Sequence, residues 1–141
     1  MAVKLINSIH NCQMLYRKAE LPLSDLTGRS HTLIFAVCEF PGRSQDAIAQ
    51  ELHLDKSTVA RALSRLEADG YVKRTVNEKD NRQLVVCPTQ KALDVFPQVK
   101  TVAKNWARLL VDNISTDEIK LFNSILQRMH DNATKAVKSI E

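Results

Sequence analysis

The chain has 141 residues, a formal net charge of +4 and an isoelectric point near 9.1. This length suits one domain that buries about two-thirds of its unfolded surface, and it is short for two independent domains. The mild positive charge permits a polyanionic partner without identifying one. Only three glycines occur, and none belongs to a GxGxxG or GxxxxGK[ST] loop, which disfavours an enzyme that uses a nucleotide.

Neither a secretion signal nor a transmembrane helix is predicted. The longest apolar run is LIFAVC, and polar residues interrupt the apolar residues near the N-terminus. The three cysteines, Cys12, Cys38 and Cys87, are odd in number and far apart, unlike a secreted disulfide framework. We therefore expect a cytoplasmic protein that has no membrane partner.

Two helices are predicted before residue 43. Apolar spacing indicates a first helix over about 3–19, and the stretch LPLSDLTG ends it through Pro22 and Gly28. A second helix over about 30–40 ends at the Pro41-Gly42 pair. Its expected inward-facing residues are Leu33, Ile34, Val37 and Phe40.

Two short helices follow, separated only by HLD. Ser44 is placed to cap the first of them, and Asp55 is placed to cap the second. The second helix has an apolar stripe at i, i+3, i+4, i+7 spacing, which predicts one buried face. This stripe consists of Val59, Ala62, Leu63 and Leu66.

The opposite face of that helix is rich in hydrogen-bond donors. Ser57, Arg61 and Ser64 lie roughly opposite the stripe, with Arg65 beside them, and no acid occurs from Lys56 to Leu66. A solvated helix usually mixes acids and bases at i, i+4 spacing. The pattern favours a negatively charged neighbour, and an ordinary solvated face is the alternative.

The pattern changes to a period of two after Gly70, which suits a left-handed helix end. The runs YVKRTV and QLVVC predict a β-hairpin with the charged tip NEKDNR. Thr89 is placed to cap a fifth helix that reaches about residue 112, and Pro97 should kink or divide it. Ser115 and Glu118 predict a capping box at the start of the last helix.

Two short helices joined by a three-residue turn and followed by a charged hairpin are typical of a winged helix-turn-helix. Hydroxyls in the first turn of the second helix are suited to phosphates, and its arginines to guanine edges or phosphates. Arg82 at the hairpin tip is suited to an A·T-rich minor groove. The candidate DNA-binding residues are Ser44, Gln45, Lys56, Ser57, Thr58, Arg61, Ser64, Arg65, Lys79, Asp80 and Arg82.

The segment IAQELHLDKSTVARALSRLEADGYVKR, followed by DNR and PTQKA, resembles the core of MarR-family transcription regulators. The resemblance implies a mainly α fold with a small β-hairpin wing, in which a winged helix-turn-helix core is joined by N- and C-terminal dimerisation helices. It also implies that Asp80 orients Arg82. Two departures are His53 and Ala92, where the family commonly has glycine; histidine tolerates a positive φ better than most residues.

The resemblance implies a single domain over 1–141, with a DNA-binding lobe at 30–90 and a helical dimerisation region at 1–20 and 91–141. A homodimer would read a pseudo-palindromic operator in double-stranded DNA. The apolar last helix independently favours a partner surface, with intramolecular packing against the first helix as the alternative. The candidate dimerisation residues are Leu5, Ile9, Ile119, Phe122, Ile125, Leu126 and Met129.

By the same resemblance, the protein is expected to be a repressor relieved by a small aromatic or amphipathic effector. Alternatives are an oxidant sensor that uses Cys12 and a winged-helix protein-interaction module that binds no DNA. A buried structural Cys12 is favoured over a reactive one, because no lysine or arginine precedes it within one turn. No metal, cofactor or catalytic residue is predicted. His31, His53 and His130 lie in different elements and are expected at the surface or at caps.

Overall fold

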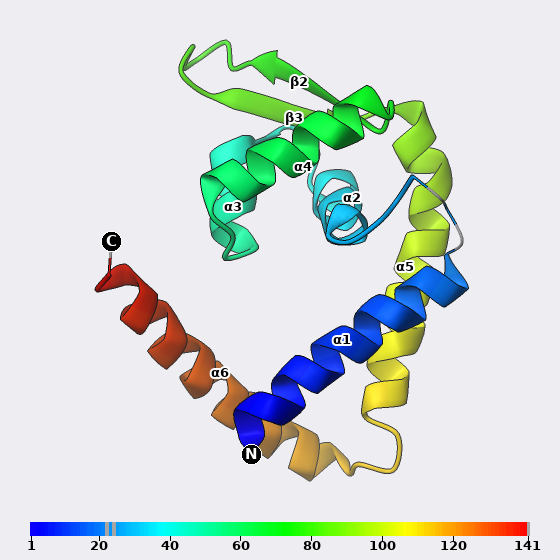
Figure 1. The fold of residues 1–141 in the computed structure, drawn as a ribbon, viewed down its shortest axis with the longest axis vertical. Coiled ribbons are helices and arrows are strands. Elements are labelled where there is room, and N and C mark those ends of the chain that lie inside the picture. Colours follow the sequence, from blue (N-terminus) through cyan, green and yellow to red (C-terminus); the bar gives the residue numbers. More distant parts are fainter. Residues whose placement is uncertain (22, 24, 141) are drawn as a thin grey trace. The chain divides into compact units, whose positions relative to one another are not determined.

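The computed structural model describes residues 1–21, 23 and 25–140. The chain divides into an N-terminal unit, Met1–Trp106, and a C-terminal unit, Ala107–Glu141. No helix within the described part of the chain is long and apolar enough to cross a membrane. The elements, shown in Figure 1, are α1 (Ala2–Glu20), α2 (Ser30–Glu39), β1 (Arg43–Ser44), α3 (Gln45–Glu51), α4 (Lys56–Ala68), β2 (Val72–Val76), β3 (Leu84–Pro88), α5 (Gln90–Leu110) and α6 (Thr116–Lys138).

Three helices begin at the side-chain caps that the sequence predicts. The Ser44 hydroxyl accepts a hydrogen bond from the Ala47 amide, and the Asp55 carboxylate accepts one from the Thr58 amide. At the start of α6, Ser115 and Glu118 form the complete capping box. Such caps satisfy amides that have no partner inside the helix, which explains why the boundaries are readable locally.

The core of the N-terminal unit forms where the apolar faces of α2 and α4 meet α3, α5 and the sheet. Figure 1 shows α4 with the β2–β3 hairpin on one side and α2 and α3 on the other. Val59, Leu63 and Leu66 are fully buried, as the stripe predicts. Phe40 corrects the prediction for α2: it lies at the C-cap, is 54% exposed, and carries the Arg43 guanidinium over its ring at 4.7 Å.

The hairpin is confirmed, and it belongs to a three-stranded antiparallel sheet of order β1-β3-β2. In the hairpin, Val76 pairs with Leu84 near the tip and Val72 pairs with Pro88 at the base. The sequence analysis missed β1, which pairs Arg43 with Val86. A strand of two residues is too short to show a period of two.

The predicted turns adopt the backbone conformations that their residues suggest. His53, between α3 and α4, has a φ of 51°, and Gly70, after α4, has a φ of 79°. Gly28, in the α1–α2 connection, also has a positive φ, whereas Pro22, predicted to help end the first helix, lies outside the described residues. Pro97 does not divide α5, which is assigned as one helix from Gln90 to Leu110.

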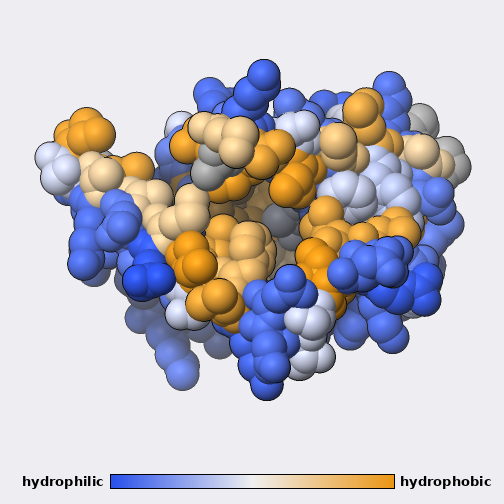
Figure 2. Space-filling model, turned by 90° about the horizontal axis from the view of Figure 1, so that it is seen from below, coloured by the Kyte–Doolittle hydropathy of each residue, from blue (hydrophilic) through white to orange (hydrophobic). Residues whose placement is uncertain are grey.

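Large apolar side chains remain exposed on α1 and on α6, and Figure 2 shows exposed hydrophobic residues among hydrophilic ones on the side that it views. On α1, Leu5 and Ile9 are 56% and 45% exposed. On α6, Phe122 is 57% exposed, and no residue of that helix is buried. Six of the candidate dimerisation residues are therefore exposed, and Ile119 is partly buried; the exposed ones are Leu5, Ile9, Phe122, Ile125, Leu126 and Met129.

Candidate nucleic-acid interface

The outward face of α4 consists of the polar residues that the sequence places opposite its stripe. Ser57, Arg61, Ser64 and Arg65 are all exposed, while the stripe is buried except for Ala62, which is partly buried. The Arg61 guanidinium lies 3.4 Å from the Thr58 hydroxyl on the same helix. Arg65 lies 3.9 Å from Asp69 in an exposed i,i+4 pair, which holds it only weakly. Both arginines are therefore free to reach an anionic partner.

The first turn of α4 is organised by the carboxylate of Asp55. Its Oδ1 accepts hydrogen bonds from the Ser57 hydroxyl at 2.6 Å and from the Thr58 amide at 2.8 Å. These hydrogen bonds hold the pKa of the Asp55 carboxyl well below its usual range. The Ser57 proton is thus already donated within the protein. Lys56 pairs with Asp46 of α3 at 2.8 Å and keeps three-quarters of its side chain exposed.

Arg74, on β2, is a central residue that the sequence analysis missed. Its Nε and Nη2 lie 3.1 and 2.8 Å from Glu67 Oε2, and its backbone amide donates to Glu67 Oε1. Its Nη2 also donates to the Ser64 hydroxyl, and its Nη1 donates to Gln45 Oε1. Only 15% of the Arg74 side chain is exposed. One guanidinium therefore joins both helices of the helix-turn-helix to the wing.

The tip of the wing presents the predicted pair of Asp80 and Arg82. Asp80 Oδ1 accepts from the Arg82 backbone amide at 3.1 Å and from Arg82 Nε at 3.3 Å. This is the orienting contact that the family resemblance implies. Arg82 is 91% exposed, and Lys79 beside it is exposed as well. The wing therefore projects two cations from a turn that Asp80 holds.

The candidate DNA-binding residues all lie in the N-terminal unit, on β1, α3, α4 and the wing. Their roles in the free protein differ. Ser44 caps α3, Ser57 donates to Asp55, and Ser64 and Gln45 accept from Arg74. The side chains whose donors face solvent are chiefly those of Lys56, Arg61, Arg65, Lys79 and Arg82.

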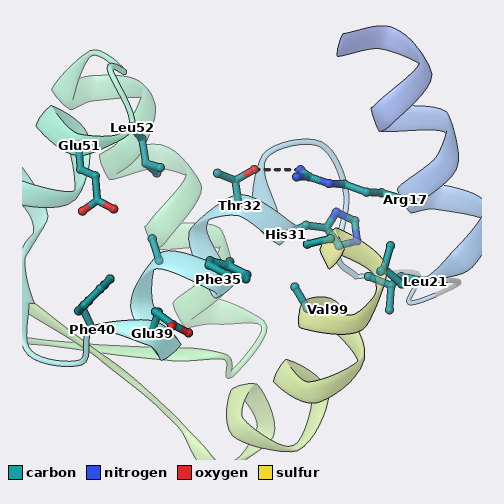
Figure 3. Close-up of a pocket in the computed structure, with 13 residues that line it drawn as sticks. Arg17, Leu21, His31, Thr32, Phe35, Glu39, Phe40, Glu51, Leu52 and Val99 are labelled. Carbon is teal, nitrogen blue, oxygen red and sulfur yellow. Dashed lines mark hydrogen bonds between the residues drawn. The ribbon is translucent and has the colours of Figure 1, made fainter. Parts of the chain in front are cut away.

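A separate cavity of about 250 Å³ lies in the N-terminal unit, between α1, α2, α5 and the end of α3. Figure 3 shows Arg17 and His31 on one side of it and Glu39, Phe40 and Glu51 on the other. Arg17 donates to the Thr32 hydroxyl at 3.0 Å. Burial lowers the pKa of the Arg17 guanidinium, and burial followed by the charge of Arg17 lowers the pKa of His31.

His31 contradicts the expectation of a surface or capping histidine, because it is only 4% exposed. Within the described residues, neither of its ring nitrogens has a hydrogen-bond partner. Its burial follows from its place on the inner face of α2, one residue before Thr32, against α1 and α5. Burying an imidazole without a hydrogen-bond partner costs free energy.

The exposure of Cys12 differs from the prediction. Cys12, expected to be buried, is exposed in the single chain, because it lies on a face of α1 that the N-terminal unit does not cover. Cys38 is buried, and burial raises the pKa of its thiol to about 11. Among the described residues, no three histidine, cysteine or acidic side chains are grouped closely enough to hold a metal ion.

Comparison with known proteins places these features in context. Residues 24–83 match the sequence model of the MarR family. The chain is 24% identical over 108 residues to an uncharacterized HTH-type transcriptional regulator, YybA, of Bacillus subtilis (strain 168), which covers 77% of this chain and 72% of that protein. It is 27% identical over 110 residues to the transcriptional regulator HosA of Escherichia coli, which covers 78% and 80%.

Solved structures share the whole fold. The transcriptional regulator SlyA superposes with a TM-score of 0.88 at 24% identity, over 99% of each chain. A MarR-family regulator of Listeria monocytogenes, solved with 26mer DNA, has a TM-score of 0.85 at 18% identity, over 95% and 89%. PcaV of Streptomyces coelicolor, solved with its natural ligand, has a TM-score of 0.79 at 21% identity, over 92% and 91%.

Proposed function

The chain belongs to the MarR family of DNA-binding transcription regulators, which are not enzymes, and from that premise we propose that it is a homodimeric repressor. The repressor binds a pseudo-palindromic operator in duplex DNA and is released by a small-molecule ligand. The α4 helix enters the major groove, and Arg82 of the wing enters the adjacent minor groove.

The arrangement that supports this proposal is the exposed donor face of α4 beside the projecting wing. Arg61 and Arg65 are long enough to reach base edges or phosphates, and the Arg82 side chain is almost entirely exposed. The Listeria monocytogenes relative was solved with 26mer DNA. Docking with α4 in the major groove and the wing in the adjacent minor groove would give each protomer contacts to two neighbouring grooves.

An electrophoretic shift titration at two salt concentrations tests DNA binding directly. A protein that neutralises about six phosphates loses roughly 10³-fold in affinity between about 50 and 200 mM salt. We expect a decrease of that order on a duplex that contains the operator, which is identified by selection from random duplexes. A protein-interaction module without DNA binding would shift no duplex at either concentration.

The homodimer is supported by the apolar stripes on α1 and α6. Phe122 is 57% exposed on α6, and Ile125, Leu126 and Met129 continue the same face at 37–38% exposure. An exposed apolar stripe of this length is unfavourable in water, and a second copy of the chain offers a self-complementary surface. Sedimentation of the protein at micromolar concentration tests this point, because a stable monomer would contradict it.

Ligand release is supported by the chemistry of the cavity. Its volume of about 250 Å³ lies just below the range of about 300 to 1,000 Å³ that is typical of ligand pockets, so it suits a single-ring compound. Phe35 supplies an aromatic wall, and Arg17 and His31 supply polar groups at one end. PcaV was solved with its natural ligand. We propose an aromatic carboxylate whose negative charge is held by Arg17.

Benzoate and its uncharged isostere benzamide test this assignment. Benzoate at millimolar concentration should raise the melting temperature and release the operator, and benzamide should do neither. Arg17→Met should abolish the benzoate effect while leaving DNA binding intact. Release by hydrogen peroxide, lost in Cys12→Ser and unaffected in Arg17→Met, would instead support the oxidant-sensing alternative.

A further inference from the structure

The guanidinium of Arg74 occupies acceptor atoms of two candidate DNA-binding residues at once. Its Nη1 lies 3.2 Å from Gln45 Oε1, and its Nη2 lies 2.9 Å from the Ser64 Oγ. Both distances are within hydrogen-bond range. Arginine has five N–H donors and no acceptor, so at each contact the partner residue must accept.

These contacts decide which hydrogen-bonding groups remain for another molecule. Ser64 accepts from Arg74 through its oxygen, so its hydroxyl proton is left to donate elsewhere. Gln45 accepts through its amide oxygen, so its two amide protons are left to donate. The usual pairing of glutamine with adenine uses both the amide oxygen and the amide nitrogen. Gln45 is therefore presented as a donor to phosphate or to a base acceptor.

Glu67 holds the Arg74 guanidinium in the orientation that makes both contacts possible. Two of the Arg74 nitrogens meet Glu67 Oε2, and the Arg74 amide meets the other carboxylate oxygen. This contact lowers the pKa of the Glu67 carboxyl, which therefore stays charged beside the guanidinium. An ion pair that served stability alone would need only Glu67. The remaining N–H groups of the fork are directed to Ser64 and Gln45.

We propose that Arg74 is a positioning residue for DNA recognition. It acts through Gln45 and Ser64, which it holds as hydrogen-bond donors toward the duplex, and it links their placement on α3 and α4 to the wing through β2. This inference rests on the proposed function, because it requires the helix-turn-helix face to be the DNA-binding surface. Arg74 itself, at 15% exposure, does not need to touch DNA.

A thermodynamic cycle in operator affinity tests the proposal. The variants are Arg74→Lys, the double variant Gln45→Ala/Ser64→Ala, and the combined triple variant. Lysine keeps the charge beside Glu67 but lacks the fork, so it preserves the ion pair and loses the simultaneous contacts. Lys73→Met, one residue earlier on β2, removes an exposed charge and is the matched control.

Arg74→Lys should weaken operator binding by about 2- to 10-fold for each hydrogen bond lost. The triple variant should bind no more weakly than the weaker of its two parents, because the same interaction cannot be lost twice. Lys73→Met combined with the double variant should show losses that multiply. Affinities are measured well below the lowest melting temperature, and sedimentation confirms that each variant is a dimer.

A purely structural Arg74 predicts a different pattern. Coupling would then appear in the free energy of unfolding, while the losses in operator affinity would multiply or be absent; either result overturns the proposal and leaves the proposed function intact. A wild-type protein that binds no duplex at low salt overturns the proposed function and this inference together. The positioning role of Arg74 is supported if the losses in operator affinity do not multiply in the triple variant.

Discussion

Replacing Arg61 with alanine removes an exposed arginine from the face of α4 that lies opposite its buried stripe. The side chain is exposed, and its guanidinium donates a hydrogen bond of 3.4 Å to the Thr58 hydroxyl of the same helix. Alanine is the best helix former, so the helix itself should not be weakened. Any loss of DNA binding in Arg61→Ala is therefore a loss of contact with the duplex.

The expected magnitude follows from what one arginine contributes. A bidentate arginine–guanine pair contributes about 1 to 3 kcal/mol of discrimination, which is roughly a 5- to 150-fold change for each half-site. An arginine that contacts only phosphate would weaken binding uniformly and lower the salt slope by about one unit. The two roles are thus separated by sequence dependence rather than by the size of the loss.

The assay compares Arg61→Ala with the wild type on the selected operator and on operators with one base pair changed at a time. Arg29→Ala is the matched control, because Arg29 is exposed, lies outside the candidate set and carries the same charge. We expect the variant to lose preference at one base position per half-site. Equal losses on every sequence would reduce Arg61 to a phosphate contact, and unchanged affinity would refute its place in the interface.

Three further predictions address other parts of the molecule. Arg82→Ala should weaken binding mainly to operators with A·T-rich flanks, while the dimer is retained in sedimentation; equal affinity on all flanks would remove the wing from the mechanism. Phe122→Asp should dissociate or unfold the protein, because a charge would enter an apolar seam, and a normal dimer would refute the placement of α6. Tyr71→Phe should lower the free energy of unfolding by about 1 kcal/mol at neutral pH, because it removes the 2.9 Å hydrogen bond to Asp25. Lys91 and this hydrogen bond lower the pKa of the Asp25 carboxyl in the folded state, so the stabilisation by Asp25 is present above the pKa of this carboxyl in the unfolded chain and is lost as the pH falls. The free energies of unfolding of wild type and variant, measured in urea, should therefore converge in acid.

The features that sequence alone predicts are those that depend on neighbouring residues. The caps at Ser44, Asp55 and Ser115 and the positive φ at Gly70 are each decided within a few residues, and all are confirmed, whereas the positive φ at His53 is expected only from the family resemblance. The buried stripe of α4 is equally local, because a helical period of 3.6 shows in eleven residues. The hairpin follows from two runs with a period of two.

The features that the sequence does not predict depend on contacts between distant residues. Arg74 meets Gln45 across 29 residues, and no local pattern distinguishes it from the neighbouring Lys73. His31 reads as one isolated histidine until α1 and α5 enclose it. Phe40 satisfies the helical period, yet α2 ends one residue earlier and the ring turns outward under Arg43.

The surroundings of Cys12 depend neither on local sequence nor on contacts within one chain alone. Its exposure in the single chain differs from the predicted burial, because the face of α1 that carries it is not covered within the N-terminal unit. A homodimer that uses Leu5 and Ile9 of the same helix changes the surroundings of this face. Neither the sequence nor the structure of one protomer specifies the surroundings of Cys12, because burial of this face of α1 depends on the second copy of the chain.

The spacing of the operator half-sites tests the central claim most directly, because it depends on two identical lobes held in one geometry. Two copies of α4 that enter successive major grooves require half-site centres about one turn, or 10 bp, apart. We expect footprints over both halves at the native spacing. Inserting about five base pairs turns one half-site to the far side of the duplex, and affinity should fall toward the non-specific level, at least about 10³-fold weaker. Binding as tight after the half-turn insertion as at the native spacing would contradict a homodimeric repressor that reads DNA as a rigid two-fold pair.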